Sequence, residues 1–175
     1  SCLVGSEMCI RDRITAECES YEVFKKALYI VMMNITKMLA KDGEGATKLL
    51  ECTVTGAKNL DTAIIVAKSV ICSPLFKCAM FGADANWGRI LCAVGYAEAD
   101  FDINKVDVSL SSKAGEIHVC HNGAGIEFSE EVAKTVLLED EITISVSIGD
   151  GNGTATAWGC DLTYDYVKIN GDYRS

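Results

Sequence analysis

Strict alternation of apolar and polar side chains over residues 142–148 (Ile-Thr-Ile-Ser-Val-Ser-Ile) is the strongest constraint that this sequence places on its fold. Successive side chains of a β-strand point to opposite faces, so the segment predicts a strand with one buried and one polar face. Weaker alternation predicts further strands over residues 48–55, 106–110, 117–119 and 154–162. The sequence therefore predicts a sheet whose strands are spread along most of the chain.

Segments with the 3.6-residue period of an α-helix lie between these strands. They are residues 22–41, 60–73, 87–94 and 130–137. Asn59 and Ser129 are residue types that cap helix N termini, and each directly precedes one of these segments. A short further strand is expected over residues 78–81. Because helices and strands interleave irregularly, the pattern favours an α+β fold with a mixed sheet over a regular parallel α/β sheet.

The chain of 175 residues is acidic, with 25 Asp and Glu against 16 Lys and Arg and a formal net charge of −9. Nucleic acids and anionic membranes are bound mainly through Lys and Arg, so the charge argues against both as partners. The longest uninterrupted apolar stretch, residues 27–33, is far shorter than the roughly 20 residues of a membrane span. Cationic or zwitterionic small molecules are compatible with this surface.

Nine cysteines are present, an odd number, and no two have the CxxC spacing of a metal or redox motif. Several fall inside apolar runs, including Cys72 and Cys92. Such cysteines are typically buried reduced thiols that pack as small apolar side chains. The pattern predicts a reducing compartment and hence a cytoplasmic protein.

Residues 1–13 fit neither a helical nor a strand period. They resemble the read-through of a sequencing adapter, of the kind found at the ends of environmental gene fragments. We therefore expect residues 1–13 to be non-native, residues 14–175 to carry the fold, and the natural gene to extend upstream.

Residues 43–48 (Gly-Glu-Gly-Ala-Thr-Lys) resemble half of a phosphate-binding loop. A complete loop places Gly-Lys-Ser/Thr between a strand and a helix, whereas the expected order here is helix, loop, strand, and Glu44 would repel phosphate. Two interpretations remain besides nucleotide binding. In one, the two glycines let the backbone pack closely and hold the Glu44 carboxylate at a cleft, where it suits an ammonium group. In the other, the helix simply ends and Glu44 is solvated.

Two further motifs suggest metal ions but fit other structures better. Residues 150–161 begin as a calcium loop, yet Ala155 stands where the tight turn needs glycine, and a hairpin turn at residues 149–153 accounts for the glycines. Residues 118–121 (His-Val-Cys-His) offer three zinc-type ligands without a fourth at metal spacing, which favours a surface hairpin. No metal site is predicted.

Three motifs together resemble the ornithine acetyltransferase family, the bifunctional glutamate N-acetyltransferases of arginine biosynthesis. They are residues 41–48 (Lys-Asp-Gly-Glu-Gly-Ala-Thr-Lys), residues 81–90 (Phe-Gly-Ala-Asp-Ala-Asn-Trp-Gly-Arg-Ile) and the tail from Thr156 to Ser175. The motifs occur in the family's order and with its separations, and the likeness covers residues 14–175. The chain resembles the C-terminal part of the family's second chain.

The resemblance implies a mixed α/β fold of the ornithine acetyltransferase type, incomplete at the N terminus, and a covalent mechanism. Members of the family cut themselves into two chains, and the new N-terminal threonine of the second chain takes acetyl from N-acetylornithine and passes it to glutamate. Neither this nucleophile nor the oxyanion donors of the first chain can be located here, so no catalytic residue is assigned. The implied partner is the family's first chain, in an assembly of two-chain units.

Three substrate-binding residues are implied by their positions in the family's motifs. Glu44 matches the loop glutamate, whose carboxylate would pair with a substrate ammonium group. Asn170 and Ser175 match the polar pair at the family's C terminus, where serine keeps the hydroxyl of the more usual threonine. No cofactor is implied, although acetyl-coenzyme A would serve as an alternative acetyl donor. The competing interpretation is a non-catalytic module that binds an amino acid or docks to another chain.

Overall fold

A computed structural model of the chain describes residues 19–173. These residues divide into two compact units, one ending at Thr36 and the other beginning at Lys37, and each is described by itself. The expected non-native segment 1–13 and the predicted site residue Ser175 lie outside the described residues.

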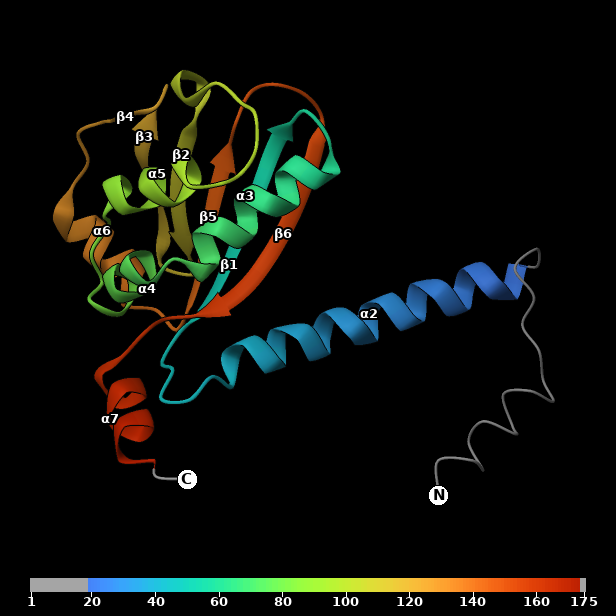
Figure 1. The fold of residues 1–175 in the computed structure, drawn as a ribbon, viewed down its shortest axis with the longest axis horizontal. Coiled ribbons are helices and arrows are strands. Elements are labelled where there is room, and N and C mark those ends of the chain that lie inside the picture. Colours follow the sequence, from blue (N-terminus) through green and yellow to red (C-terminus); the bar gives the residue numbers. More distant parts are fainter. Residues whose placement is uncertain (1–18, 174–175) are drawn as a thin grey trace. The chain divides into compact units, whose positions relative to one another are not determined.

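The described part of the second unit is built around a six-stranded mixed sheet with the strand order β4-β3-β2-β5-β1-β6 (Figure 1). The strands are β1 (Leu49–Ala57), β2 (Asp107–Ser112), β3 (Gly115–His121), β4 (Ala124–Gly125), β5 (Glu141–Ser147) and β6 (Gly153–Cys160). β1 and β5 run parallel, and the other neighbouring pairs are antiparallel. The predicted α+β fold with a mixed sheet is confirmed, and the alternating segment 142–148 supplies the interior strand β5.

The helices are α2 (Glu19–Lys41), α3 (Leu60–Cys72), α4 (Pro74–Phe81), α5 (Trp87–Gly95), α6 (Glu130–Leu137) and α7 (Tyr164–Asp172), with a short 3₁₀ helix at Ile103–Lys105. α3 packs against β1 and β6, and α6 packs against β2 and β3. The Asn59 side-chain oxygen accepts a hydrogen bond from the Thr62 amide (2.8 Å), and the Ser129 hydroxyl accepts one from the Val132 amide (3.3 Å). Both predicted helix caps are therefore confirmed.

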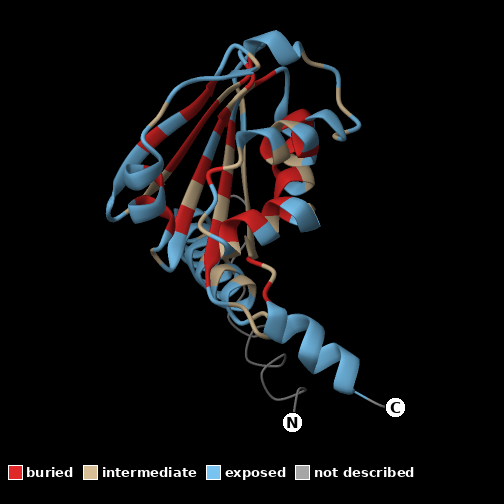
Figure 2. Ribbon diagram, turned by 90° about the vertical axis from the view of Figure 1, so that its left-hand side faces the viewer, coloured by how far each residue is buried: buried red, intermediate tan, exposed pale blue. Residues whose placement is uncertain are grey.

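One apolar core joins the sheet to helices α3, α4, α5 and α6 (Figure 2). It includes three alternate side chains of β1 and three of β5. These side chains are Leu50, Cys52, Val54, Ile142, Ile144 and Val146. Most of the intervening positions carry hydroxyl side chains that are half-buried or exposed, and the hydroxyls of Thr53 and Thr156 lie 3.0 Å apart across β1 and β6. The alternation therefore separates a buried face from a polar face, as predicted.

The strand expected over residues 78–81 is wrong, because these residues belong to helix α4. The Ser73 hydroxyl accepts a hydrogen bond from the Phe76 amide (3.4 Å), and Pro74 occupies the first turn, where a missing N–H leaves no helix bond unmade. Phe76 and Met80 are buried one helical turn apart. Pro74 thus begins a second helix in addition to ending α3.

The glycine-rich segment 149–153 does not form the expected hairpin. β1 lies between β5 and β6 in the sheet, so the segment connects two strands that are not paired with each other. The last glycine allows a close backbone approach instead, because a Cβ atom at Gly153 would lie 2.3 Å from the Asn59 carbonyl oxygen. The pattern indicates a turn correctly but does not indicate which strand the next one joins.

Three of the six described cysteines are exposed, so the expectation that cysteines in apolar runs are buried is wrong for them. Cys72, Cys78 and Cys92 lie on helices α3, α4 and α5. A helix turns by about 100° per residue, so an apolar run longer than one face extends onto the solvent side. Cys52 and Cys120 are buried, and each of the described cysteines is free.

We expect a thiol reagent to modify Cys72, Cys78 and Cys92 in the folded protein and to leave Cys52 and Cys120 unmodified. Burial raises the pKa of both protected thiols, which suppresses the reactive thiolate in addition to blocking access. Peptide mass spectrometry after a brief labelling reaction would identify the modified residues. Rapid modification of Cys52 without denaturant would contradict its buried position.

Burial raises the pKa of the Cys52 thiol from 9.0 to about 12. The folded protein is therefore expected to lose stability at alkaline pH. A thiol with a raised pKa contributes fully to stability below about pH 9 and loses that contribution as the pH rises toward 12. At ~1.36 kcal/mol per pKa unit, the unfolding free energy falls by about 2–3 kcal/mol at pH 11. Urea unfolding of the chain and of Cys52→Ala at pH 8 and pH 11 measures this change, because the variant lacks the thiol. An equal change in both proteins would refute it.

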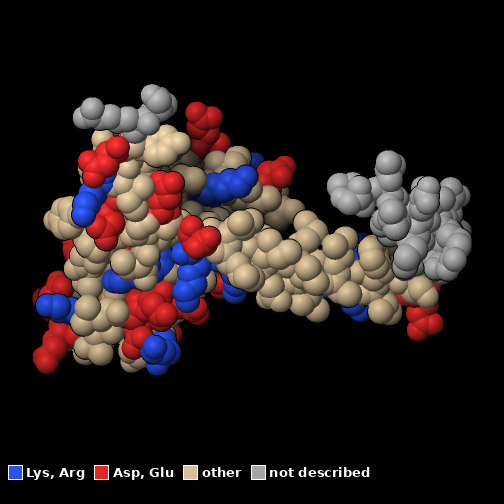
Figure 3. Space-filling view, turned by 90° about the horizontal axis from the view of Figure 1, so that it is seen from below, with Lys and Arg blue, Asp and Glu red and all other residues tan. Residues whose placement is uncertain are grey.

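Helix α2 has no buried residue along its 23 positions, although more than half of its side chains are apolar. Its exposed side chains include Val23 (64% exposed), Met38 (69%) and Leu39 (71%). The face of this helix that is visible in Figure 3 carries few charges. Apolar surfaces of this extent are usually interaction surfaces.

Among residues 19–173, no single helix is both long enough and apolar enough to cross a membrane. Helices α3 and α4 reach the required length and composition only when they are taken together, as a pair bent by 58°.

Candidate functional site

The candidate site forms where the loop before β1 meets the segment after β6. β1 and β6 are antiparallel neighbours, with Leu49 opposite Cys160. Residues 42–48, which join α2 to β1, therefore lie beside residues 161–163, which join β6 to α7 (Figure 1). Sheet pairing thus brings together the first and the third of the three sequence motifs.

Glu44 lies in a tight turn of this loop. The Ala46 amide donates a hydrogen bond to the Gly43 carbonyl oxygen (3.0 Å), which closes the turn. Gly45 has a φ of +65°, a left-handed value that favours glycine, and a Cβ atom there would lie 2.8 Å from the Tyr166 amide nitrogen. The loop is therefore packed directly against the first turn of α7.

The structure brings together Glu44 and Asn170, two of the three predicted site residues. The Asn170 Nδ2 atom donates one hydrogen bond to Glu44 Oε2 (3.0 Å) and another to the Tyr166 carbonyl oxygen (2.9 Å). Glu44 and Asn170 are both exposed, so a ligand in solution can reach them. The third predicted residue, Ser175, lies beyond the part of the chain that the structure describes.

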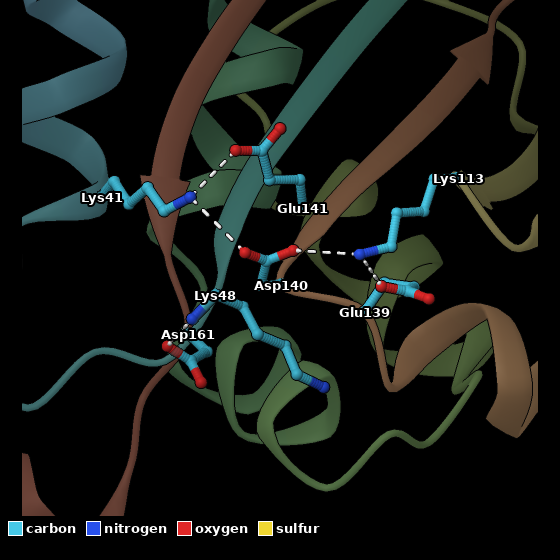
Figure 4. Close-up of polar contacts among 7 residues, drawn as sticks. All are labelled: Lys41, Lys48, Lys113, Glu139, Asp140, Glu141 and Asp161. Atoms are coloured by element: carbon cyan, nitrogen blue, oxygen red, sulfur yellow. Dashed lines mark hydrogen bonds and ion pairs between the residues drawn. The ribbon is translucent and has the colours of Figure 1, made fainter.

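Asp161 and Thr163 hold the loop in this position through hydrogen bonds. No sequence pattern indicated this role. Asp161 Oδ1 accepts a hydrogen bond from the backbone amide of Lys48 (3.1 Å; Figure 4). The same oxygen accepts from the Thr47 amide (2.8 Å), and the Thr47 hydroxyl donates to Oδ2. The Thr163 hydroxyl donates to the Gly45 carbonyl oxygen (2.6 Å). The Asp161 carboxylate, at the twelfth position of the partial calcium motif, is thus engaged by donors of the loop.

Helix α7 was missed by the periodicity of the sequence, although its N terminus carries a recognisable signal. The Thr163 hydroxyl accepts a hydrogen bond from the Tyr166 amide (3.3 Å), and Asp165 stands in the first turn. A capping threonine followed by an acidic residue is typical of a helix N terminus. The helix has only nine residues, none of them buried, and it lacks the apolar period by which the helices over residues 22–41, 60–73, 87–94 and 130–137 were predicted.

Lys48 is unavailable to a phosphate group. Its side chain points away from Asp161 (Figure 4). The Lys48 Nζ atom donates hydrogen bonds to the carbonyl oxygens of Met80 (2.7 Å) and Leu137 (2.5 Å). These carbonyls lie at the C-terminal ends of α4 and α6, where a helix dipole favours a cation. Burial lowers the pKa of Lys48, and the charge of Asp161 opposes part of this shift. The observed order of helix, loop and strand also differs from that of a phosphate-binding loop.

Ion pairs hold the residue from which the loop starts. Lys41, the last residue of α2, places Nζ 2.9 Å from Glu141 and 3.6 Å from Asp140, at the start of β5 (Figure 4). The hydrogen bond to Glu141 and the nearby carboxylates raise the pKa of Lys41. Lys113 joins the cluster through Asp140, at 4.0 Å, and also pairs with Glu139, at 2.6 Å. Each exposed pair contributes little to stability, so the cluster acts mainly on the position of the helix end.

The hairpin predicted around residues 118–121 is confirmed. β3 and β4 pair across the turn Asn122-Gly123, whose φ values of +50° and +71° suit a two-residue hairpin. His121 Nδ1 lies 2.8 Å from Asp107, and its Nε2 lies 2.9 Å from the Asn122 side chain. Within residues 19–173, no group of three His, Cys, Asp or Glu side chains is arranged to hold a metal ion.

Residues 3–175 match the ArgJ family. The arginine biosynthesis bifunctional protein ArgJ 1 of Clostridium acetobutylicum is 56% identical over 162 residues, which are 93% of this chain and 40% of that protein. ArgJ of Caldanaerobacter subterraneus is 54% identical over 155 residues, which are 89% of this chain and 38% of that protein. A crystal structure of ArgJ from Bacillus halodurans is 44% identical, with a TM-score of 0.88 over 96% of this chain and 78% of that chain.

The chain spans about two fifths of the length of these curated relatives. It spans a much larger share of the solved Bacillus halodurans chain, which is therefore about half as long as the curated relatives. The family match covers almost the whole sequence, and the solved fold agrees with it. This chain belongs to the ArgJ family, the ornithine acetyltransferase family of arginine biosynthesis that its three motifs resemble.

Proposed function

We propose that this chain is part of an acetyltransferase that moves acetyl from N-acetylornithine to glutamate in arginine biosynthesis. The observation that carries the proposal is the contact between Glu44 and Asn170, which lie 126 positions apart in the sequence. Both stand at motif positions that the family resemblance assigns to substrate binding. Ser175 follows Asn170 by five residues in the sequence, and we propose it as the third contact.

The pair is suited to hold a substrate ammonium group. An ionised carboxylate only accepts hydrogen bonds, and a protonated amine only donates them. Both hydrogens of Asn170 Nδ2 are directed at Glu44 and Tyr166, so the Asn170 carbonyl oxygen is the atom that can accept from a substrate. Glu44 and Asn170 together offer two acceptors to one ammonium group of ornithine.

The proposed chemistry proceeds through an acetyl-enzyme. A threonine hydroxyl attacks the acetyl carbonyl of N-acetylornithine, its proton passes to the departing amine, and the C–N bond breaks to release ornithine. The amine of glutamate then attacks the ester, which restores the hydroxyl and forms N-acetylglutamate. The family resemblance assigns the threonine to the N terminus of the second chain and the oxyanion donors to the first. The transfer needs no cofactor, and acetyl-coenzyme A would be an alternative donor.

We also propose that the family's first chain, as a separate chain, covers the apolar surface of α2. A chain that spans two fifths of its relatives leaves the larger part of such a protein outside it. The solved Bacillus halodurans chain is about half as long as the curated relatives, which is compatible with a protein of two chains. The exposed α2 surface supplies the apolar area that such a partner would bury. The free described cysteines support a cytoplasmic location.

The test uses a restored enzyme, in which the 162 aligned residues of this chain replace the corresponding residues of the Clostridium acetobutylicum relative. We expect the restored enzyme to form N-acetylglutamate from N-acetylornithine and glutamate, with the unaltered relative as the control. Product is measured by mass spectrometry. A folded restored enzyme that binds N-acetylornithine but transfers no acetyl would contradict the proposal and favour a non-catalytic amino-acid-binding module.

A further inference from the structure

Asp161 and Thr163 connect the loop that carries Glu44 to the helix that carries Asn170. Their side chains bond to neighbours of Glu44 and Asn170 and not to these two side chains. Asp161 is 2% exposed and Thr163 is 5% exposed, and both lie in the short segment between β6 and α7. Polar side chains at such depth are seldom found without a specific set of partners. Their partners here are the Glu44 loop on one side and the first turn of α7 on the other.

Asp161 fixes the end of the loop that leads into β1. Its carboxylate accepts from two consecutive backbone amides, of Thr47 and Lys48, and from the Thr47 hydroxyl. The Lys48 side chain is held at its other end by the Met80 carbonyl oxygen. This end of the loop therefore cannot shift without breaking several buried hydrogen bonds.

Thr163 fixes the turn itself to helix α7. Its hydroxyl donates to the carbonyl oxygen of Gly45, the residue after Glu44, and accepts from the Tyr166 amide. Asn170 lies one helical turn beyond Tyr166 and donates to the Tyr166 carbonyl oxygen. A single hydroxyl thus couples the backbone beside Glu44 to the helical turn that presents Asn170.

We propose that Asp161 and Thr163 are positioning residues that hold Glu44 and Asn170 at the spacing in which both can accept from one substrate ammonium group. This inference rests on the proposed function of the Glu44–Asn170 pair. Loss of either residue weakens binding of N-acetylornithine because the two acceptors separate. Such a loss is expected to leave the acetyl-transfer step little changed, because the two side chains are bonded to the loop and to the first turn of α7.

Variants of Thr163 in the restored enzyme separate positioning from helix capping. An ionised aspartate accepts hydrogen bonds but donates none, so Thr163→Asp keeps the cap of α7 and loses the bond to Gly45. Thr163→Ser keeps both bonds. Ser129→Ala is the matched control, because it removes the cap at the N terminus of α6, whereas the bond from Lys48 to the Leu137 carbonyl oxygen lies at the opposite end of that helix.

We expect Thr163→Asp to raise the KM for N-acetylornithine about tenfold with kcat within about twofold, and Thr163→Ser to leave both within about twofold. Ser129→Ala should lower the melting temperature without raising KM. An unchanged KM in Thr163→Asp, or an equal rise in Ser129→Ala, would overturn the inference.

A double-mutant cycle tests whether Asp161 acts through Glu44. Asp161→Asn should raise KM about tenfold when Glu44 is present and have no further effect in a Glu44→Gln background. An equal rise in KM in both backgrounds would overturn the inference. If Asp161→Asn does not fold, the Thr163 variants decide the inference. Inactivity of the unsubstituted restored enzyme would instead refute the proposed function, so the two failures are distinguishable.

Discussion

The 175-residue chain by itself is expected to form no detectable N-acetylglutamate from N-acetylornithine and glutamate. The proposed mechanism needs a threonine nucleophile and oxyanion donors, and the family resemblance assigns both to positions outside residues 14–175. Loss of a nucleophile of this kind lowers kcat by roughly a millionfold. The ammonium site that we propose at Glu44 and Asn170 does not include these groups, so binding and catalysis are expected to separate in this chain.

The measurement compares the purified chain with the restored enzyme under the same substrate concentrations, with product detected by mass spectrometry. A thermal melt of the chain establishes that it is folded, so that a lack of product is not caused by unfolding. Product formation by the folded chain above the uncatalysed background would place a nucleophile within these residues. It would overturn the assignment of the acetyl-enzyme to an upstream threonine.

The strands with one buried and one polar face could be predicted from the sequence, because apolar residues stand at the buried positions and polar residues at the exposed ones. In β5, Ile144 is fully buried and Ser145 is exposed, so the local pattern already contains the outcome of tertiary packing. Helices α3, α5 and α6 were predicted for the same reason, because apolar side chains recur with the helical period on their buried faces. The 23 residues of α2 show the period although none is buried, whereas the short helix α4 was missed although it buries Phe76 and Met80. Helix α7 was missed because its nine residues bury no side chain and its local signal is its cap.

The pairing between strands that are distant in the sequence could not be predicted, because the residues of one strand do not indicate its partner. The turn at residues 149–153 is visible in the sequence, but nothing near it indicates that β6 joins the far edge of β1. The sheet order depends on how strands from distant parts of the chain share one apolar core, which no single segment encodes. The meeting of Glu44 with Asn170 follows from this pairing, so the periodicity of the chain could not predict it.

The burial of Asp161 also depends on the pairing of distant segments, so it could not be predicted from the local sequence. From the sequence, Asp161 is only the twelfth position of an incomplete calcium motif, and its acidic side chain would be expected at the surface. It is buried because antiparallel pairing of β1 with β6 places it opposite the loop amides, which donate to its carboxylate. The resemblance identified the residues that would touch the substrate, and the structure adds those that hold them.

Glu44→Gln in the restored enzyme is expected to lower kcat/KM for N-acetylornithine by about tenfold to a hundredfold. The substitution keeps the size of the side chain and an oxygen that can accept from Asn170, but it removes the negative charge. A hydrogen bond that involves a charged group contributes about 1.5–3 kcal/mol, and the loss of that free energy accounts for the expected factor. Steady-state acetyl transfer at varied N-acetylornithine concentration measures it.

The control is Glu98→Gln, which removes one negative charge from an exposed position between α5 and β2 and leaves the Glu44 loop intact. The free energy of unfolding of each variant is expected to lie within about 0.5 kcal/mol of that of the restored enzyme, because each substitution replaces an exposed side chain. A loss of kcat/KM in Glu44→Gln alone would then be due to the local charge and not to net charge or stability. If Glu44→Gln kept full kcat/KM with an intact fold, Glu44 would be a solvated loop residue, and its bond to Asn170 would only join the loop to α7.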